Sequence, residues 1–119
     1  MNGGASIKGS IDLSDDEGSP IAETRIETMR ENDKYKAIMG DCSARVTVGL
    51  DESIGGPYGY SNAKIRVSVT LSCDQSEESM EKAKRYALDE CLTFIEDRIG
   101  TSYKQLTDHL ERYYHKEAR

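Results

Sequence analysis

Basic and hydroxyl side chains alternate with apolar ones in two segments, residues 45–50 and 63–73. Successive side chains of a strand point to opposite faces, so each segment predicts a half-buried strand with one polar side. That side collects Arg45, Thr47, Lys64, Arg66, Ser68, Thr70 and Ser72. Such a row suits charge-assisted hydrogen bonds to phosphate or carboxylate oxygens. The alternative is an ordinary solvated sheet face, where these residue types are common.

The connection between the two segments, residues 51–62, contains the sequence G-G-P-Y-G-Y. Tyr58 and Tyr60 therefore stand in a glycine context beside cations, as in proteins that stack single-stranded bases on aromatic rings. The same loop would suit recognition of a protein, because tyrosine offers contact area at low entropic cost. The tyrosines could equally fold back on the sheet. The glycine pattern is neither a dinucleotide fingerprint nor a P-loop.

A second candidate surface is acidic and lies in the C-terminal third of the chain. Glu77, Glu78, Glu81 and Asp89 belong to a predicted helix and would bind a basic protein partner. No constellation for catalysis is evident, because no nucleophile has a neighbouring base. His109 and His115 lack the spacing of metal ligands. We expect no enzyme activity, no metal and no cofactor.

Composition limits the fold and the partners. The chain has 119 residues, of which 36% are hydrophobic, with no Trp and one Phe, so it predicts one domain with a small core. Dimerisation would relieve that thin core, and a homodimer is one expectation. The net charge of −6 disfavours a general coat for duplex DNA or a binder of anionic membranes. Residues 45–73 alone are net positive, with three Lys/Arg against two Asp/Glu.

Cysteine usage and hydropathy indicate a cytoplasmic protein. Cys42, Cys73 and Cys91 form no C-x-x-C pair, and their odd number favours reduced thiols. Cys73 and Cys91 fall on predicted apolar faces, where a thiol acts as a small hydrophobe. The chain has no apolar run of membrane-spanning length and no signal-peptide core at its N-terminus.

The N-terminal 40 residues give weaker patterns. Residues 1–20 are rich in Gly, Ser and Asp and predict a disordered acidic tail. Within it, residues 11–17 look like a SUMO-interacting peptide followed by an acidophilic-kinase site, although a solvated linker is the simpler interpretation. Residues 21–40 fit either a helix or a short hairpin, and the alternation of Thr24, Ile26 and Thr28 favours the hairpin.

The C-terminal third predicts two helices. Asp74 with Glu77 forms a capping box, and Gly100 stands where a left-handed cap would end the first helix. Ser102 with Gln105 would cap the second. An apolar stripe follows the first helix: Met80, Ala83, Ala87, Leu88, Cys91, Leu92, Ile95 and Ile99. The predicted fold of residues 21–119 is α+β, an antiparallel sheet of two to four strands packed on one face by two C-terminal helices, with a β-β-α-α core.

The run R-V-T-V-G-L, then G-P-Y-G-Y-S-N-A-K-I-R-V-S-V-T-L-S-C and an acidic amphipathic helix, resembles small uncharacterised accessory proteins of tailed bacteriophages. The resemblance covers about residues 45–99 and implies an accessory protein of a mobile element, without catalytic residues.

Three functional hypotheses follow. In the first, a non-enzymatic accessory protein binds single-stranded nucleic acid: Tyr58 and Tyr60 stack on bases, and Arg45, Lys64 and Arg66 neutralise phosphates. In the second, the acidic helices form a protein-interaction module, such as a phage-type inhibitor of a host protein. In the third, the chain is a self-assembling structural component.

Overall fold

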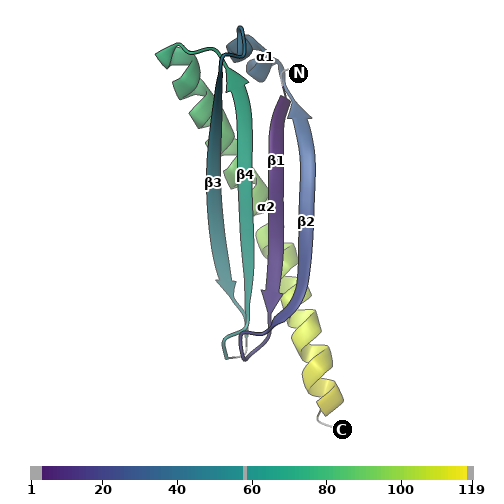
Figure 1. The fold of residues 1–119 in the computed structure, drawn as a ribbon. Coiled ribbons are helices and arrows are strands. Elements are labelled where there is room, and N and C mark those ends of the chain that lie inside the picture. The colour runs from purple at the N-terminus through teal and green to yellow at the C-terminus, as the bar shows by residue number, and fades with distance from the viewer. Residues whose placement is uncertain (1–3, 58, 118–119) are drawn as a thin grey trace.

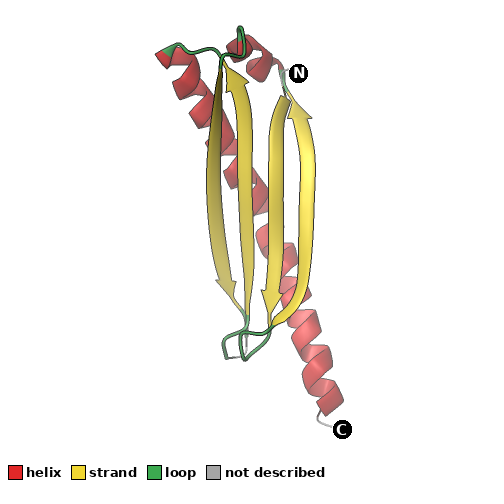
Figure 2. Ribbon diagram, viewed as in Figure 1, coloured by secondary structure: helices red, strands yellow, loops and turns green. Residues whose placement is uncertain are grey.

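A computed structural model describes residues 4–57 and 59–117 of the protein (Figures 1 and 2). Two β-hairpins are joined by a short helix and followed by a long one. The elements are β1 (Gly4–Ser14), β2 (Pro20–Glu31), α1 (Asp33–Met39), β3 (Ala44–Gly55), β4 (Asn62–Cys73) and α2 (Glu77–Glu117).

The four strands form one antiparallel sheet in the order β2-β1-β4-β3, so the first strand of one hairpin and the last strand of the other meet in the middle. The helix α2 runs diagonally across one face of this sheet and continues past its end (Figure 1). Its 41 residues correspond to about 60 Å of helix, which matches the longest dimension of the molecule, 63 Å. The short helix α1 closes one end of the sheet, and the opposite face carries no helix (Figure 2).

The core lies between the central strands and α2. The inward side chains of β1 and β4 are buried almost without exception: Ala5, Ile7, Ile11, Leu13, Ala63, Ile65, Val67, Val69, Leu71 and Cys73. From α2 they are met by Ala83, Ala87, Cys91, Phe94, Ile95, Leu106 and Leu110. Small residues fill the first turns of this helix face, so α2 can approach β3 and β4 closely there.

The position of α2 on the sheet is set by Phe94 and Gly9. A methyl group at Gly9 would lie 2.1 Å from Cζ of Phe94, so the ring occupies the space that any side chain at this position of β1 would need. The Arg98 guanidinium lies 3.7 Å from the centre of the same ring and donates to the Phe94 carbonyl oxygen. The single phenylalanine is thus held between a glycine backbone and a cation.

The predicted disordered tail over residues 1–20 is wrong, because residues 4–14 form β1 in the centre of the sheet. The isolated apolar residues of this segment alternate, and strands on both sides supply their partners. Ile11 and Leu13 are buried in the core, so they are not available as a linear binding motif. Residues 4–14 therefore belong to the same sheet as the central hairpin.

The segment 21–40 contains one strand and one helix rather than a hairpin. The alternation of Thr24, Ile26 and Thr28 lies in β2, which pairs with β1. The second predicted strand is instead α1, which begins after Asn32, whose side chain accepts from the backbone N–H of Lys34. Tyr35 and Ile38 of this helix are buried.

The α+β class and an antiparallel sheet of four strands are confirmed. One long C-terminal helix takes the place of the two predicted ones, and the element order is β-β-α-β-β-α. The strands of the central hairpin are also longer than expected: β3 continues to Gly55, which leaves a connection of residues 56–61 instead of 51–62. The extension matters because it adds Asp51 to the polar face.

The two predicted C-terminal helices are one. α2 starts at Glu77, where Ser76, not Asp74, accepts from the backbone of Ser79 as the cap. The helix continues through Gly100, which does not have a positive φ. Ser102 is fully buried inside it rather than capping a new helix. Burying Leu106 and Leu110 contributes about 1.5–3 kcal/mol each, which outweighs the roughly 1 kcal/mol that a glycine costs within a helix.

One buried ionic contact ties α1, α2 and β2 together. The Tyr35 hydroxyl donates to Oε1 of the buried Glu90, and Arg30 Nη1 lies 3.4 Å from the other carboxylate oxygen. Burial, and then the hydrogen bond to Glu90, raise the pKa of Tyr35. The Tyr35 ring also packs against Tyr86. A carboxylate in this position is tolerated because both of its oxygens have partners.

Substituting Gly9 tests the contact that positions α2. We expect Gly9→Ala to lower the free energy of unfolding by about 1–3 kcal/mol, because the added methyl group must displace Phe94 from a packed core. Gly49→Ala is the matched control in another strand, since its methyl group would meet nothing nearer than 3.7 Å. Equal effects of both variants in urea denaturation would contradict the assigned contact.

Substituting Gly100 tests whether α2 is continuous. A methyl group added at this position of the helix would point into open space, so Gly100→Ala should raise the free energy of unfolding by about 0.5–1 kcal/mol. A left-handed cap would give the opposite sign, because alanine is strained there. Thermal unfolding followed by circular dichroism distinguishes the two outcomes.

Substituting Tyr35 tests the buried contact. Tyr35→Phe should lower the free energy of unfolding by about 1.5–3 kcal/mol at neutral pH, since it removes a hydrogen bond to a charged group. The folded-state pKa of Tyr35 is raised, so this stabilisation is complete below the unfolded-state pKa of about 10 and is lost as the pH rises above it. The difference between wild type and variant should therefore shrink in alkaline solution. A constant difference across that range would argue against the hydrogen bond.

Candidate nucleic-acid interface

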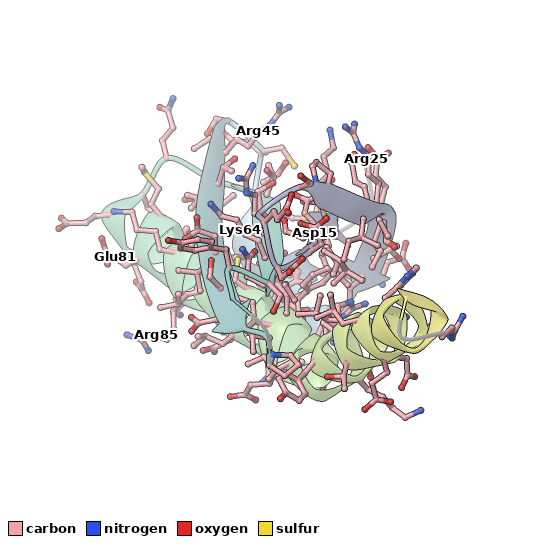
Figure 3. The ribbon with its side chains drawn as sticks, turned by 90° about the horizontal axis from the view of Figure 1, so that it is seen from below. Asp15, Arg25, Arg45, Lys64, Glu81 and Arg85 are labelled. Carbon is pink, nitrogen blue, oxygen red and sulfur yellow. The ribbon has the colours of Figure 1, made fainter. Side chains whose placement is uncertain are left out.

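The face of the sheet opposite α2 is open and polar. The outward side chains of the central hairpin are the basic and hydroxyl residues expected from the sequence, and Lys64 and Arg66 point to the same side while Ile65 and Val67 are buried. In Figure 3, Arg45 and Arg25 lie on this side, away from α2. The face is wider than the hairpin, because β1 and β2 extend it.

Arg45 does not lie across from Lys64 and Arg66. The register of β3 and β4 places Arg45 opposite Ser72, six residues along β4 from Arg66. That separation corresponds to about 20 Å of extended strand. The three predicted phosphate ligands are therefore divided between the two ends of the face.

The end that holds Lys64 and Arg66 also holds carboxylates. Asp51 is the register partner of Arg66, and its Oδ2 lies 4.0 Å from the Lys64 amine. Asp12 of β1 is the register partner of Lys64 on the other side. Neither acid lies within residues 45–50 or 63–73, so the row of basic and hydroxyl side chains predicted from the sequence did not include them. Their charges reduce the attraction of this end for an anion.

The other end of the face contains a groove of about 370 Å³ without any acidic lining residue. It is lined by Gly4, Ser6, Lys8, Met29, Arg45, Ser68, Thr70 and Ser72. Arg45 reaches it from β3 and Lys8 from β1, with the hydroxyl groups between them on β4. Among the described residues, no carboxylate lies within ion-pair distance of Arg45. Two cations over a row of hydroxyl donors can hold a phosphate-like anion.

The middle of the face has a second groove of about 410 Å³ with mixed charge. Lys8, Arg25 and Arg66 line it together with Asp12, Glu23 and Glu27. Arg25 is already bound by Glu23, with Nε 2.7 Å from Oε1. The small side chain of Ser10 lies in this groove. Lys8 was missed in the sequence because it lies in the segment interpreted as a tail.

Tyr60 is not among the residues that line the groove between Lys8 and Arg45. Its side chain is 79% exposed, and its backbone N–H donates to the Asp16 carbonyl oxygen at 2.8 Å. This contact brings the β1–β2 turn, with Asp15, Asp16 and Glu17, against the loop between β3 and β4. Gly59 permits it, because it has a positive φ and a side chain there would lie 2.7 Å from the same oxygen. Tyr58 lies outside the described residues.

The acidic residues proposed for protein binding are exposed along α2. Glu78 is paired with Lys82 at 3.1 Å and Glu81 with Lys84 at 3.2 Å, so two of the four carry local counter-charges. Glu77 and Asp89 are also exposed. They form no compact cluster, since the pairs with lysine interrupt the row.

The remaining candidates contribute no site. His109 is exposed on α2, and no group of His, Cys, Asp and Glu among the described residues could hold a metal ion. Cys42 is exposed, whereas burial raises the pKa of the Cys73 and Cys91 thiols. No described helix is long and apolar enough to cross a bilayer.

Comparisons with protein-family models, with curated proteins and with solved structures found no match for this chain.

Proposed function

We propose that the protein is a small non-enzymatic accessory protein that binds single-stranded nucleic acid on the open face of its sheet. The observation that carries this proposal is the groove between Arg45 and Lys8, where cations and hydroxyl donors meet without a carboxylate. Phosphate oxygens would accept hydrogen bonds from both side chains and from the hydroxyl groups of β4.

The arrangement of charge favours a single strand over a duplex. A duplex presents phosphates over a wide footprint, and on this face they would meet Asp12, Glu23, Glu27 and Asp51. A single strand is narrow and flexible enough to follow the acid-free groove. The chain's net charge of −6 acts in the same direction, because it repels a long polyanion everywhere else.

The proposed contacts differ from those expected from the sequence. Arg45 is the principal phosphate ligand, and Lys8, whose register partner on β2 is Glu27, adds a second cation to its groove. Lys64 and Arg66 lie outside this groove, beside Asp51 and Asp12. Among the residues that the structure describes, no aromatic side chain lines the groove, so binding there depends on the phosphate backbone. Such binding is tolerant of sequence and strongly dependent on salt. An origin in a mobile element is part of the same proposal.

The proposal is tested with fluorescently labelled single-stranded DNA and RNA oligonucleotides by anisotropy at several salt concentrations. Each phosphate neutralised contributes about −0.7 to the slope of log affinity against log salt. Lys8→Gln and Arg45→Gln should each weaken binding and make the slope shallower by about 0.7. The double variant Lys64→Gln/Arg66→Gln should have a smaller effect per cation.

Arg25→Gln is the matched control, because Arg25 lies on the same open face but outside the acid-free groove. It should leave both affinity and salt slope close to those of the wild type. Affinity that does not change with salt, or an equal loss with Arg25→Gln, would contradict the proposal. Duplex DNA of the same length should bind more weakly than the single strands.

A further inference from the structure

The two edges of the sheet differ in their protection against another strand. β2 pairs only with β1 and carries five charged residues, Glu23, Arg25, Glu27, Arg30 and Glu31, as edges of monomeric sheets commonly do. β3 pairs only with β4, and its residues 46–50 are uncharged. The backbone groups of β3 on its outer side are therefore open to a further strand.

Val46 of β3 is buried, but the apolar side chains that follow it along the strand are only partly covered. Val48 and Leu50 face the α2 side of the sheet but are half-buried, whereas their register partners Val69 and Val67 on β4 are buried. The difference arises because β3 is an edge strand: β4 lies along one of its edges, and its other edge has no neighbouring strand. An apolar surface is left along the edge.

Two leucines of α2 extend this surface. The Cys91 thiol donates to the Val48 carbonyl oxygen at 3.4 Å, which fixes the level of the helix beside β3. Viewed down the helix axis, Leu92 and Leu88 are rotated from Cys91 in the same direction, by about 100° and 60°. Glu90 is rotated in the opposite direction and contacts Arg30 of β2. Both leucines therefore lie on the β3 side of α2, and they are 45% and 39% exposed.

The same side of α2 is visible in Figure 3, where Glu81 and Arg85 project from the helix beyond β3. These residues precede Leu88 on one stripe of the helix. In Figure 1, the first turns of α2 extend past the β3 edge. The open strand edge and the exposed leucines thus belong to one side of the molecule.

We propose that this side binds a second copy of the chain, with the two β3 strands pairing antiparallel about a two-fold axis near Val48. In that register, Arg45 lies opposite Asp51 of the second copy on the open face, and Val46 lies opposite its Leu50 on the α2 side. Both the charged pair and the apolar pair then occur twice, once on each side of the axis. Arg45 lacks an ion pair within the described chain, which this pairing supplies.

The helices provide the second layer of the interface. The two-fold axis near Val48 passes beside Cys91, so Leu88 and Leu92 of both copies face one another beneath the paired strands. A stable interface commonly buries about 800 Å² on each partner, which a strand edge does not supply without side-chain packing below it. The result is an eight-stranded sheet with both α2 helices on one face. This inference is argued independently of the proposed nucleic-acid binding, and the two compete for Arg45, because Asp51 of the second copy would lie beside the groove that Arg45 lines.

The experiment is sedimentation equilibrium of the full chain, with light scattering on a sizing column as a second measurement. The wild type should have twice the chain mass of 13.3 kDa. Leu88→Glu/Leu92→Glu should be monomeric with an unchanged circular dichroism spectrum, because both side chains are exposed within one copy. Met29→Glu, which places the same charge at an exposed apolar residue of β2, should stay dimeric.

The charge pair gives a reciprocal test. Arg45→Asp should weaken the dimer about tenfold or more, since it places like charges opposite one another. Arg45→Asp/Asp51→Arg should restore dimerisation, which a structural defect at either position would not do. A wild type that is monomeric at every concentration, a dimer unaffected by the leucine substitutions, or a double charge variant no better than Arg45→Asp would each overturn the proposal.

Discussion

The contact of Phe94 with Gly9 fixes how the two layers of this protein meet. The chain has one phenylalanine and no tryptophan, and this phenylalanine is the largest apolar side chain buried between the helix and the sheet. Its ring occupies the space that Gly9 leaves in the central strand, and Arg98 covers its far side. Because α2 is a single continuous helix, this contact, together with those of Glu90 and Cys91, determines which of its residues meet β3, α1 and β2.

The central place of β1 determines the chemistry of the open face. By lying between β2 and β4, it inserts Asp12 beside Lys64 and adds Lys8 to the groove that contains Arg45. The segments 45–50 and 63–73 alone would carry a uniformly basic strip. The complete sheet instead has an end of mixed charge and, toward the other end, a groove whose lining residues include no acid, so the attraction for an anion is local and directional.

The sequence predicts the elements whose patterns are regular. The alternation in β3 and β4 gives the correct faces for Lys64 and Arg66. The predicted apolar stripe of α2 is correct in part: Ala83, Ala87, Cys91 and Ile95 are buried, whereas Leu88, Leu92 and Ile99 are exposed. β1 and the continuity of α2 could not be predicted in this way, because both depend on partners far away in the chain. The tail-like composition of residues 4–14 becomes a strand only between β2 and β4. Likewise, Gly100 and Ser102 resemble a helix boundary until Leu106 and Leu110 are buried. The same holds for the candidate site. Its row of hydroxyl groups could be predicted from the alternation within one strand, whereas Lys8 and Asp12 lie beside that row only because β1 pairs with β4.

Because the first strand of the chain lies in the middle of the sheet, folding during synthesis has a required order. Each hairpin joins neighbouring segments and can close as it leaves the ribosome, but β1 meets β4 only after residue 73 has emerged. Until then the inward side of the first hairpin has no cover, and α2, made last, covers both hairpins together. The nascent chain therefore carries an unburied apolar surface until α2 has emerged, a period in which chaperone contact or pairing with another nascent chain competes with closure.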